Sequence, residues 1–285
     1  MSDSAAPIFP TSDDDPEMDE ATKQARLTFR FFWRELAWEQ RRIVPGLDLA
    51  AIKASLSDPP GTQSATDDGF NVEHMWLLEV DFDGREISGT LINTPHSLTT
   101  FQEGDRVTIT GKQLCDWLYV VSGDVYGGFT VDVLRSRMSK RDRKQHDAAW
   151  GFDFGDVGVV NLVPPEYLGE APAKKGLLAK LGGGASQSQE FATVAAVEHP
   201  MSINMRGSLQ QALNDDPTFL KQADAKGFTL LHQLSLAGSL DGVEVCLAHG
   251  ADPNQATSRG LTAFALAKSL GWQRVMERLQ QAGGR

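Results

Sequence analysis

The stretch VEHMWLLEVDF, residues 72 to 82, carries the clearest strand signal in the sequence and decides the fold. Large side chains recur at every second position, and a strand would place them on one face: Val72, His74, Trp76, Leu78, Val80 and Phe82. The turn dipeptide Asp83-Gly84 follows directly, and residues 85–93 offer a return strand. Because two strands alone are marginally stable in water, the neighbouring segments are expected to complete a sheet.

Further strands are expected on both sides of this hairpin. Residues 106–110, 114–121 and 125–133 have strand patterns, and the last two flank a turn at Ser122-Gly123-Asp124. The short apolar run 49–56 fits a helix or a strand equally well. A short basic helix is predicted after Ser139, which has the side chain of an N-cap residue, and Gly151 is expected to end it.

A long helix is predicted before the sheet, with Asp15 as N-cap, Pro16 at the first position and Pro45-Gly46 after its end. One stripe of this helix is apolar: Met18, Ala21, Ala25, Phe29, Phe32, Leu36 and Ile43. Phe31, Trp33 and Trp38 lie off the stripe, so they are either buried by sheet and loops or exposed for a partner. Burial is the favoured interpretation. The fold class is therefore α+β, with a mainly antiparallel sheet packed by a long N-terminal helix.

The totals allow two ordinary domains, because the chain has 285 residues and is 41% hydrophobic. No run of about 18 apolar residues suggests a membrane span, and the N-terminus is acidic where a signal peptide would be basic. A cytoplasmic location is expected. Cys115 and Cys246 fall in different predicted domains, so both thiols are expected to be reduced.

The formal net charge of −11 is unevenly distributed. Residues 72–135 hold ten acids and four bases, which gives 4 − 10 = −6. An acidic surface disfavours nucleic acid as a direct ligand and suits a basic protein partner. The alternative interpretation is that these acids serve solubility alone.

Composition changes divide the chain into four parts. Residues 1–14 are too poor in apolar side chains to fold and are expected to be disordered, and residues 15–163 form the α+β domain. Residues 164–190 contain Gly182-Gly183-Gly184 and form a flexible linker before an all-α domain at 191–285.

A set of short motifs in the α+β part resembles the YegJ-like family of bacterial domains. The motifs are Glu73-His74-Met75-Trp76, Gly89, Asn93, Pro95, Gly104-Asp105, Asp116-Trp117 and Gly127-Gly128-Phe129-Thr130. The resemblance covers about residues 17–163 and implies a strand at Ile52-Lys53-Ala54. It implies a fold and supplies no catalytic mechanism.

The C-terminal part contains an internal repeat. Gly227-Phe228-Thr229-Leu230-Leu231-His232 and Gly260-Leu261-Thr262-Ala263-Phe264 begin 33 residues apart. This period is similar to that of ankyrin repeats and implies about three units in residues 191–285. In such repeats the threonine caps the first helix and His232 bonds within the repeat. Ala263-Phe264 departs from the usual Pro-Leu, so the last unit is expected to be a cap.

Residues with catalytic potential are few. His74 lies beside Glu73, but adjacent strand residues point to opposite faces, so a buried structural histidine is the favoured interpretation. Asp116 could lie at the mouth of a pocket, although an acid that hydrogen-bonds backbone is the preferred alternative. No histidine or cysteine spacing matches a metal site, and no phosphate-binding loop is present. We therefore predict a protein that is not an enzyme and has no cofactor.

Protein binding has better support from the sequence. An ankyrin array offers its hairpin tips and first helices to partners. The predicted partner-binding residues are Asp224, Lys226, Phe228, Gln233, Asn254 and Arg259, together with Asp116 and Trp117. Trp272 is expected to be packed between helices. The alternative is that so short an array packs on the first domain and stabilises it.

Three functional hypotheses remain open. The leading one is a cytoplasmic immunity protein that binds and occludes a basic secreted bacterial toxin, such as a nuclease. The second is a scaffold or regulatory adaptor for an endogenous protein. The third is an enzyme or small-ligand binder centred on His74 and Asp116. Direct nucleic-acid binding and membrane insertion are not expected, and the oligomeric state is left open.

Overall fold

The computed structural model describes residues 15–59, 62, 72–169 and 187–285. Contacts between Cα atoms divide the chain into two compact units. Unit 1 comprises Met1–Leu27, Gly46–Asp81 and Ser88–Asn161, and unit 2 comprises Thr28–Pro45, Phe82–Ile87 and Leu162–Arg285. The division passes through the long helix and through the central hairpin. The four sequence-based domain boundaries stay a prediction, and the segments 1–14 and 170–186 lie outside the described residues.

Helix α1 spans Pro16–Glu39. The Asp15 carboxylate accepts the backbone N–H groups of Glu17 and Met18 at 3.2 and 3.3 Å, which is the predicted N-cap. The three aromatic side chains that lie off the apolar stripe are all buried, which confirms their expected role in the core: Phe31, Trp33 and Trp38. The extension of the stripe to Ile43 is wrong, because the helix ends at Glu39 and Ile43 is 99% exposed.

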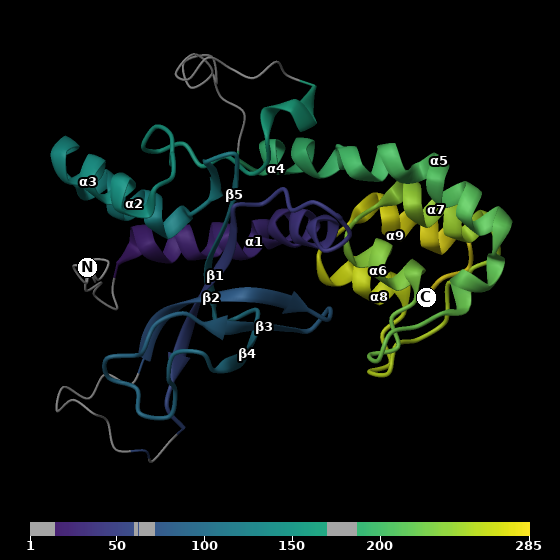
Figure 1. Cartoon of the computed structure of the whole chain (residues 1–285), viewed down its shortest axis with the longest axis horizontal. Coiled ribbons are helices and arrows are strands. Elements are labelled where there is room, and N and C mark those ends of the chain that lie inside the picture. Colours follow the sequence, from purple (N-terminus) through teal and green to yellow (C-terminus); the bar gives the residue numbers. More distant parts are fainter. Residues whose placement is uncertain (1–14, 60–61, 63–71, 170–186) are drawn as a thin grey trace. The chain divides into compact units, whose positions relative to one another are not determined.

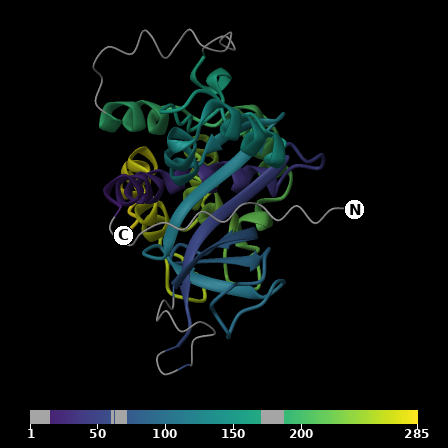
Figure 2. The ribbon, with the colours of Figure 1, turned by 90° about the vertical axis from the view of Figure 1, so that its left-hand side faces the viewer.

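The six-stranded sheet has the order β4-β3-β2-β1-β5-β6. Its strands are β1 (Leu49–Ser57), β2 (Val72–Phe82), β3 (Glu86–Leu91), β4 (Arg106–Thr110), β5 (Leu114–Val121) and β6 (Asp124–Gly127). Strand β1 pairs antiparallel with both β2 and β5, and β1 and β5 run side by side as long twisted arrows in Figure 2. The predicted α+β fold class is confirmed. The segment 49–57 is a strand, as the family resemblance implies.

Strand β2 does not keep the single apolar face that its alternation predicts. Met75 and Leu77 are buried in its first part, and Val80 and Phe82 are buried in its last part. The buried positions change from odd to even numbers at Glu79, whose φ of +50° lies in the left-handed region. A residue in this conformation offsets the alternation, as a β-bulge does. The predicted face is therefore wrong for the first half of the strand.

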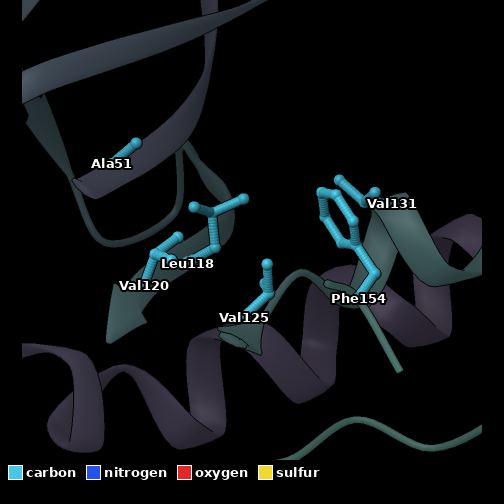
Figure 3. Close-up of a cluster of buried hydrophobic side chains, with 6 residues drawn as sticks. All are labelled: Ala51, Leu118, Val120, Val125, Val131 and Phe154. Carbon is cyan, nitrogen blue, oxygen red and sulfur yellow. The ribbon is translucent and has the colours of Figure 1, made fainter. Parts of the chain in front are cut away.

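The face of the sheet on which Trp76 and Leu78 lie is also covered. A cluster of six buried side chains from β1, β5, β6, α2 (Phe129–Arg137) and the loop after α3 (Lys140–Trp150) forms a core there (Figure 3): Ala51, Leu118, Val120, Val125, Val131 and Phe154. The partly buried Trp76 and Leu78 of β2 pack against this cluster. Trp76 meets Trp150 edge to face, with ring centroids 5.9 Å apart. Large residues at the odd-numbered and at the even-numbered positions of β2 thus both have a packing role.

The predicted strand at 125–133 is wrong beyond its first part, because β6 ends at Gly127 and α2 begins at Phe129. Gly127 has a φ of +78°, and a Cβ atom there would lie 2.3 Å from the carbonyl oxygen of Trp117. Glycine is therefore required where the chain turns from strand to helix. The next helix, α3 (Lys140–Trp150), begins after Ser139 and ends at Gly151, as predicted.

The C-terminal part of unit 2 is helical. Its elements are η1 (Pro165–Leu168), α4 (Gln187–Ala196), α5 (Pro200–Asp215), η3 (Pro217–Lys221), α6 (Leu230–Leu236), α7 (Leu240–Ala248), α8 (Ala263–Ser269) and α9 (Gln273–Gln281). Helices α6 and α8 pack on each other, as do α7 and α9 (Figure 1). Isolated β-bridges at Ala223–Thr229 and Ala256–Thr262 close two hairpins one repeat period apart. These features are those of ankyrin repeats, as predicted.

Candidate functional site

The first helix of each repeat is positioned by a hairpin and a threonine cap. In the first hairpin the Asp224 carboxylate accepts the N–H groups of Lys226 and Phe228, both at 2.9 Å. Thr229 caps α6 and bonds to His232, whose Nε2 lies 2.8 Å from the carbonyl oxygen of Gln255. Because His232 is buried and joins one hairpin to the next, it fixes the spacing between repeats.

The part of α1 that belongs to unit 2 lies against these repeats. Two arginines of this segment and one in the turn after it reach them through hydrogen bonds: Arg30 to the carbonyl oxygen of Gly271 (3.3 Å), Arg34 to that of Val197 (3.0 Å) and Arg41 to Oε1 of Gln233 (3.2 Å). Arginine suits such positions because its guanidinium group donates in several directions from one plane. The side chain of Gln233, a predicted partner contact, is thus engaged by the chain itself.

Aromatic packing accompanies these bonds. Phe31 meets Trp272 edge to face, with ring centroids 6.3 Å apart, and the guanidinium group of Arg34 lies 5.6 Å from the Trp272 ring. Trp272 is 3% exposed, and its Nε1 donates to the carbonyl oxygen of Leu236 at 3.0 Å. The prediction that Trp272 is packed between helices is confirmed, and α1 contributes to its packing.

A buried polar group fixes the same helix segment. Glu35 is 2% exposed and accepts from Nε2 of His199 and from the hydroxyl of Tyr167, both at 3.1 Å. His199 Nδ1 accepts the N–H of Met201 at 3.1 Å, so Nε2 carries the proton that bonds to Glu35. Burial lowers the pKa of His199, and burial together with the Glu35 charge raises the pKa of Tyr167. The group is therefore a neutral histidine and a phenol that hold one carboxylate.

The turn between β2 and β3 occupies a second part of the repeats. Arg259 forms ion pairs with Asp83 at 2.7 Å and with Glu86 at 2.6 Å. Gly84 has a φ of +92°, which favours glycine, and a Cβ atom there would overlap Cδ2 of Leu266 unless that side chain moved. We call the surface formed by Gln233, Arg259, Leu266 and Trp272 the occupied face, because segments 28–45 and 82–87 of the same chain contact it.

The other predicted ankyrin contacts differ in exposure. Phe228 is 8% exposed and meets the His232 ring, so its side chain has a packing role. Asp224, Lys226 and Asn254 are exposed at the hairpin tips, where Asn254 Nδ2 donates to the carbonyl oxygen of Gly283 at 3.0 Å. The structure thus separates exposed tip residues from those of the occupied face, and their partner-binding role stays a prediction.

The candidates in unit 1 are buried. Asp116 and Trp117 are both 0% exposed. The Asp116 carboxylate accepts the N–H groups of Phe129 and Thr130 at 3.0 and 2.7 Å, so it caps the first turn of α2, and burial raises its pKa. Trp117 Nε1 donates to the carbonyl oxygen of Ala25 at 2.9 Å. Asp116 therefore bonds backbone, as in the favoured alternative, and both side chains are held in internal contacts.

His74 is exposed, in contrast to the buried histidine that the sequence favours, since it lies on the first part of β2 before the alternation changes. Among the residues that the structure describes, no three His, Cys, Asp or Glu side chains could hold a metal ion together. Within the described ranges, no helix combines the length and the apolar character needed to cross a membrane. Cys115 and Cys246 are free and buried.

Sequence reasoning missed the charged residues of α1 and of the turn after it that contact the C-terminal part of unit 2, namely Arg30, Arg34, Glu35 and Arg41. The available signal was FRFFWRELAW, residues 29 to 38, in which an adjacent arginine and glutamate stand inside an aromatic run. Arg34 and Glu35 are buried within that run, at 3% and 2% exposure. Buried charges require specific partners, so this pattern indicates that the helix segment is enclosed by polar groups from elsewhere in the chain.

Comparisons with known proteins agree with this architecture. Residues 15–154 match the family described as an uncharacterized protein conserved in bacteria, DUF2314, and residues 222–267 match ankyrin repeats. A Neisseria meningitidis serogroup B protein, named as an ankyrin repeat protein, is 37% identical over 273 residues, which cover 96% of both chains. The uncharacterized protein YegJ of Escherichia coli K12 is 30% identical over 87 residues, 30% of this chain and 50% of YegJ. This chain carries an N-terminal domain of the bacterial DUF2314 family followed by ankyrin repeats, and it belongs to the same family as the Neisseria ankyrin repeat protein.

Proposed function

We propose that this protein binds another protein through surfaces outside the occupied face, and that its ankyrin repeats also hold helix α1 within the chain. One observation carries the proposal: Gln233 and Arg259, two of the residues expected to contact a partner, are engaged by Arg41 and by Asp83 and Glu86. A partner that used the same atoms would have to break these contacts first. Asp224, Lys226 and Asn254 are exposed at the hairpin tips, and within the described residues the side chains of Asp224 and Asn254 bond to backbone groups of the repeats and to no group of α1 or of the β2–β3 turn.

More specifically, we propose an immunity protein of the cytoplasm. It would neutralise a basic secreted toxin, such as a nuclease, by binding to it and blocking its surface. The excess of acids in residues 72–135 supports it, although several of these acids have internal roles. Glu73 accepts three backbone N–H groups of residues 96–98, and Asp83 and Glu86 pair with Arg259. The exposed acids Glu79, Glu103 and Asp124 are those we propose to face a basic partner.

Affinity purification of the full chain from its host, followed by mass spectrometry, tests the binding proposal. The double variant Asp224→Ala/Lys226→Ala should lower partner recovery at least about tenfold if the tips lie at the centre of the interface. Gln233→Ala is the matched control on the occupied face and should retain the partner. Loss of the partner with Gln233→Ala but not with the tip variant would overturn the proposal.

The toxin hypothesis needs a separate test against the adaptor alternative. Deletion of the gene should sensitise the host to the toxin encoded beside it, and the full chain should restore survival. A host that survives equally well without the gene, while the protein still recovers an endogenous partner, would favour a scaffold or regulatory adaptor instead.

The enzyme hypothesis has less support. His74 is exposed and Asp116 is completely buried in hydrogen bonds to α2, so the two residues expected to act together have different environments. Turnover of a metabolite that is lost in both His74→Ala and Asp116→Asn would favour it.

A further inference from the structure

Unit 2 contains a pocket of about 250 Å³ beside the contacts of Arg30 and Trp272 described above. It is lined by residues 195–198 at the end of α4, by the turn between α6 and α7, by the start of α9 and by Arg30 of α1. Its walls are largely apolar, since Val197, Leu240 and Trp272 contribute to them. A pocket of this size and composition suits a small organic molecule.

Arg30 brings a positive charge that is not compensated within the described residues. Its Nη1 donates to the carbonyl oxygen of Gly271 at 3.3 Å, and its guanidinium group lies 5.2 Å from the Phe31 ring. Its Nε is buried and has no hydrogen-bond partner in the part of the chain that the structure describes. Because Nε is shielded, an anion in the pocket would be stabilised by the charge of the guanidinium group, which burial disfavours, and not by a bond to Nε itself.

Arg274 provides a second guanidinium group at the same pocket. It is exposed, and its Nη1 donates to the carbonyl oxygen of Ala196 at 2.6 Å. Glu198 is the one acidic side chain among the described residues that line the pocket. Its carboxylate already accepts from the hydroxyl of Ser202, and burial raises its pKa. The nearby charge of Arg274 acts in the opposite direction on that pKa, so the charges at the pocket are two arginines and one carboxylate, which offsets part of the Arg274 charge.

We infer that this pocket binds a small organic anion, with a carboxylate or phosphate group between Arg30 and Arg274 and an apolar body against Trp272 and Leu240. A single guanidinium group binds a carboxylate or a phosphate through paired hydrogen bonds. The second arginine would add its charge and further donors to the same anion. The inference is independent of the protein partner, because Arg30 and Arg274 are not among the proposed tip contacts.

Titration of the ¹⁵N-labelled full chain tests this inference, with benzoate as the anionic probe and benzamide as its neutral counterpart. Benzoate should shift the backbone signals of residues 271–275 and the Nε–H signal of Arg30 in a saturable manner. Benzamide should bind at least about tenfold more weakly, because it lacks the charge that the arginines recognise. Inorganic phosphate is the second probe, and saturable shifts with it would show that the anion alone is sufficient.

Variants connect the binding to the two arginines. Arg30→Gln and Arg274→Gln should each weaken benzoate binding about tenfold, whereas Arg278→Gln, a control on the same helix α9, should leave it unchanged. Arg30→Lys keeps the charge and should retain part of the affinity, which separates loss of binding from loss of folding. Equal shifts with benzoate and benzamide, or no saturable shift with any probe, would overturn the inference.

Discussion

The two parts of helix α1 differ in how the chain buries them. In unit 1, residues 16–27 present the small side chains of Ala21 and Ala25, and the indole of Trp117 approaches closely enough to bond to the Ala25 carbonyl oxygen. In unit 2, residues 28–39 present five buried aromatic side chains: Phe29, Phe31, Phe32, Trp33 and Trp38. The first part receives a large residue from the sheet, and the second supplies the large residues itself.

The polar contacts of the two parts differ in the same way. Near the start of α1, Asp15 and Glu17 form ion pairs with Arg137, whose side chain is 41% exposed. Near the end, Glu35 is buried with His199 and Tyr167. Solvent screens exposed ion pairs, so removing one partner changes the stability little. Removing one partner of a buried charged group lowers the stability of the folded protein strongly. The comparison teaches that one regular helix can be held by screened charge at one end and by burial at the other.

The largest expected effect comes from the aromatic part. Phe32 is 0% exposed and stacks on Phe29 with ring centroids 5.6 Å apart, so Phe32→Ala should lower the free energy of unfolding by about 3–5 kcal/mol. Leu27→Ala is the control on the same helix, because Leu27 is 63% exposed, and it should change that free energy by about 0.5 kcal/mol or less. Urea denaturation measures both. Equal effects of the two substitutions would remove the distinction between the helix parts.

A smaller effect is expected at the buried carboxylate. Glu35→Gln replaces one acceptor oxygen by an NH₂ group, which leaves either His199 Nε2–H or the Tyr167 hydroxyl without its acceptor. The free energy of unfolding should fall by about 1–3 kcal/mol. Glu20→Gln in the first part of the helix is the control and should change that free energy much less, because the contacts of Glu20 with Lys23 and Gln24 are exposed. A Glu35→Gln chain as stable as the wild type would contradict the role assigned to this buried group.

The smallest effect concerns pH at the start of the helix. The hydrogen bond from Arg137 is the main cause that lowers the pKa of Asp15 to about 2, compared with 3.8 for an unperturbed aspartate. Because the folded-state pKa is depressed, Asp15 adds stability above pH 3.8, and this contribution is lost as the pH falls from 3.8 towards 2.

Asp15→Asn should therefore be less stable than the wild type at neutral pH, and the two unfolding midpoints should converge near pH 2. Added salt should also reduce the difference. Asp19→Asn removes a charge in the same first turn and controls for the effect of charge alone. A difference between Asp15→Asn and the wild type that stays constant from pH 7 to pH 2 would argue against the Arg137 pair.

Local patterns in the sequence predict much of this fold. The repeat period of 33 residues identifies the ankyrin units, and the strand bounds at 72–82, 106–110 and 114–121 are found as expected. Two errors have local causes that composition does not reveal. Glu79 adopts a left-handed conformation without being glycine, and Asp116 caps a helix that begins where a strand was expected.

The occupied face could not be predicted in the same way. Arg41 and Gln233 are 192 residues apart in the sequence, and Arg259 and Asp83 are 176 apart, so no local pattern connects them. Gln233 and Arg259 stand where partner contacts of ankyrin repeats are expected, which is why sequence reasoning assigned them to a partner. Only the folded chain shows that its own segments reach these residues.

The most direct test of the account is whether residues 28–39 of α1 contact the repeats in solution. Nuclear Overhauser effects between the ring protons of Phe31 and the indole protons of Trp272 measure this in the full chain. We expect clear cross-peaks, because the ring centroids are 6.3 Å apart and the rings meet edge to face. Their absence, with both spin systems assigned and the helix folded, would contradict the claim that the chain occupies its own ankyrin surface.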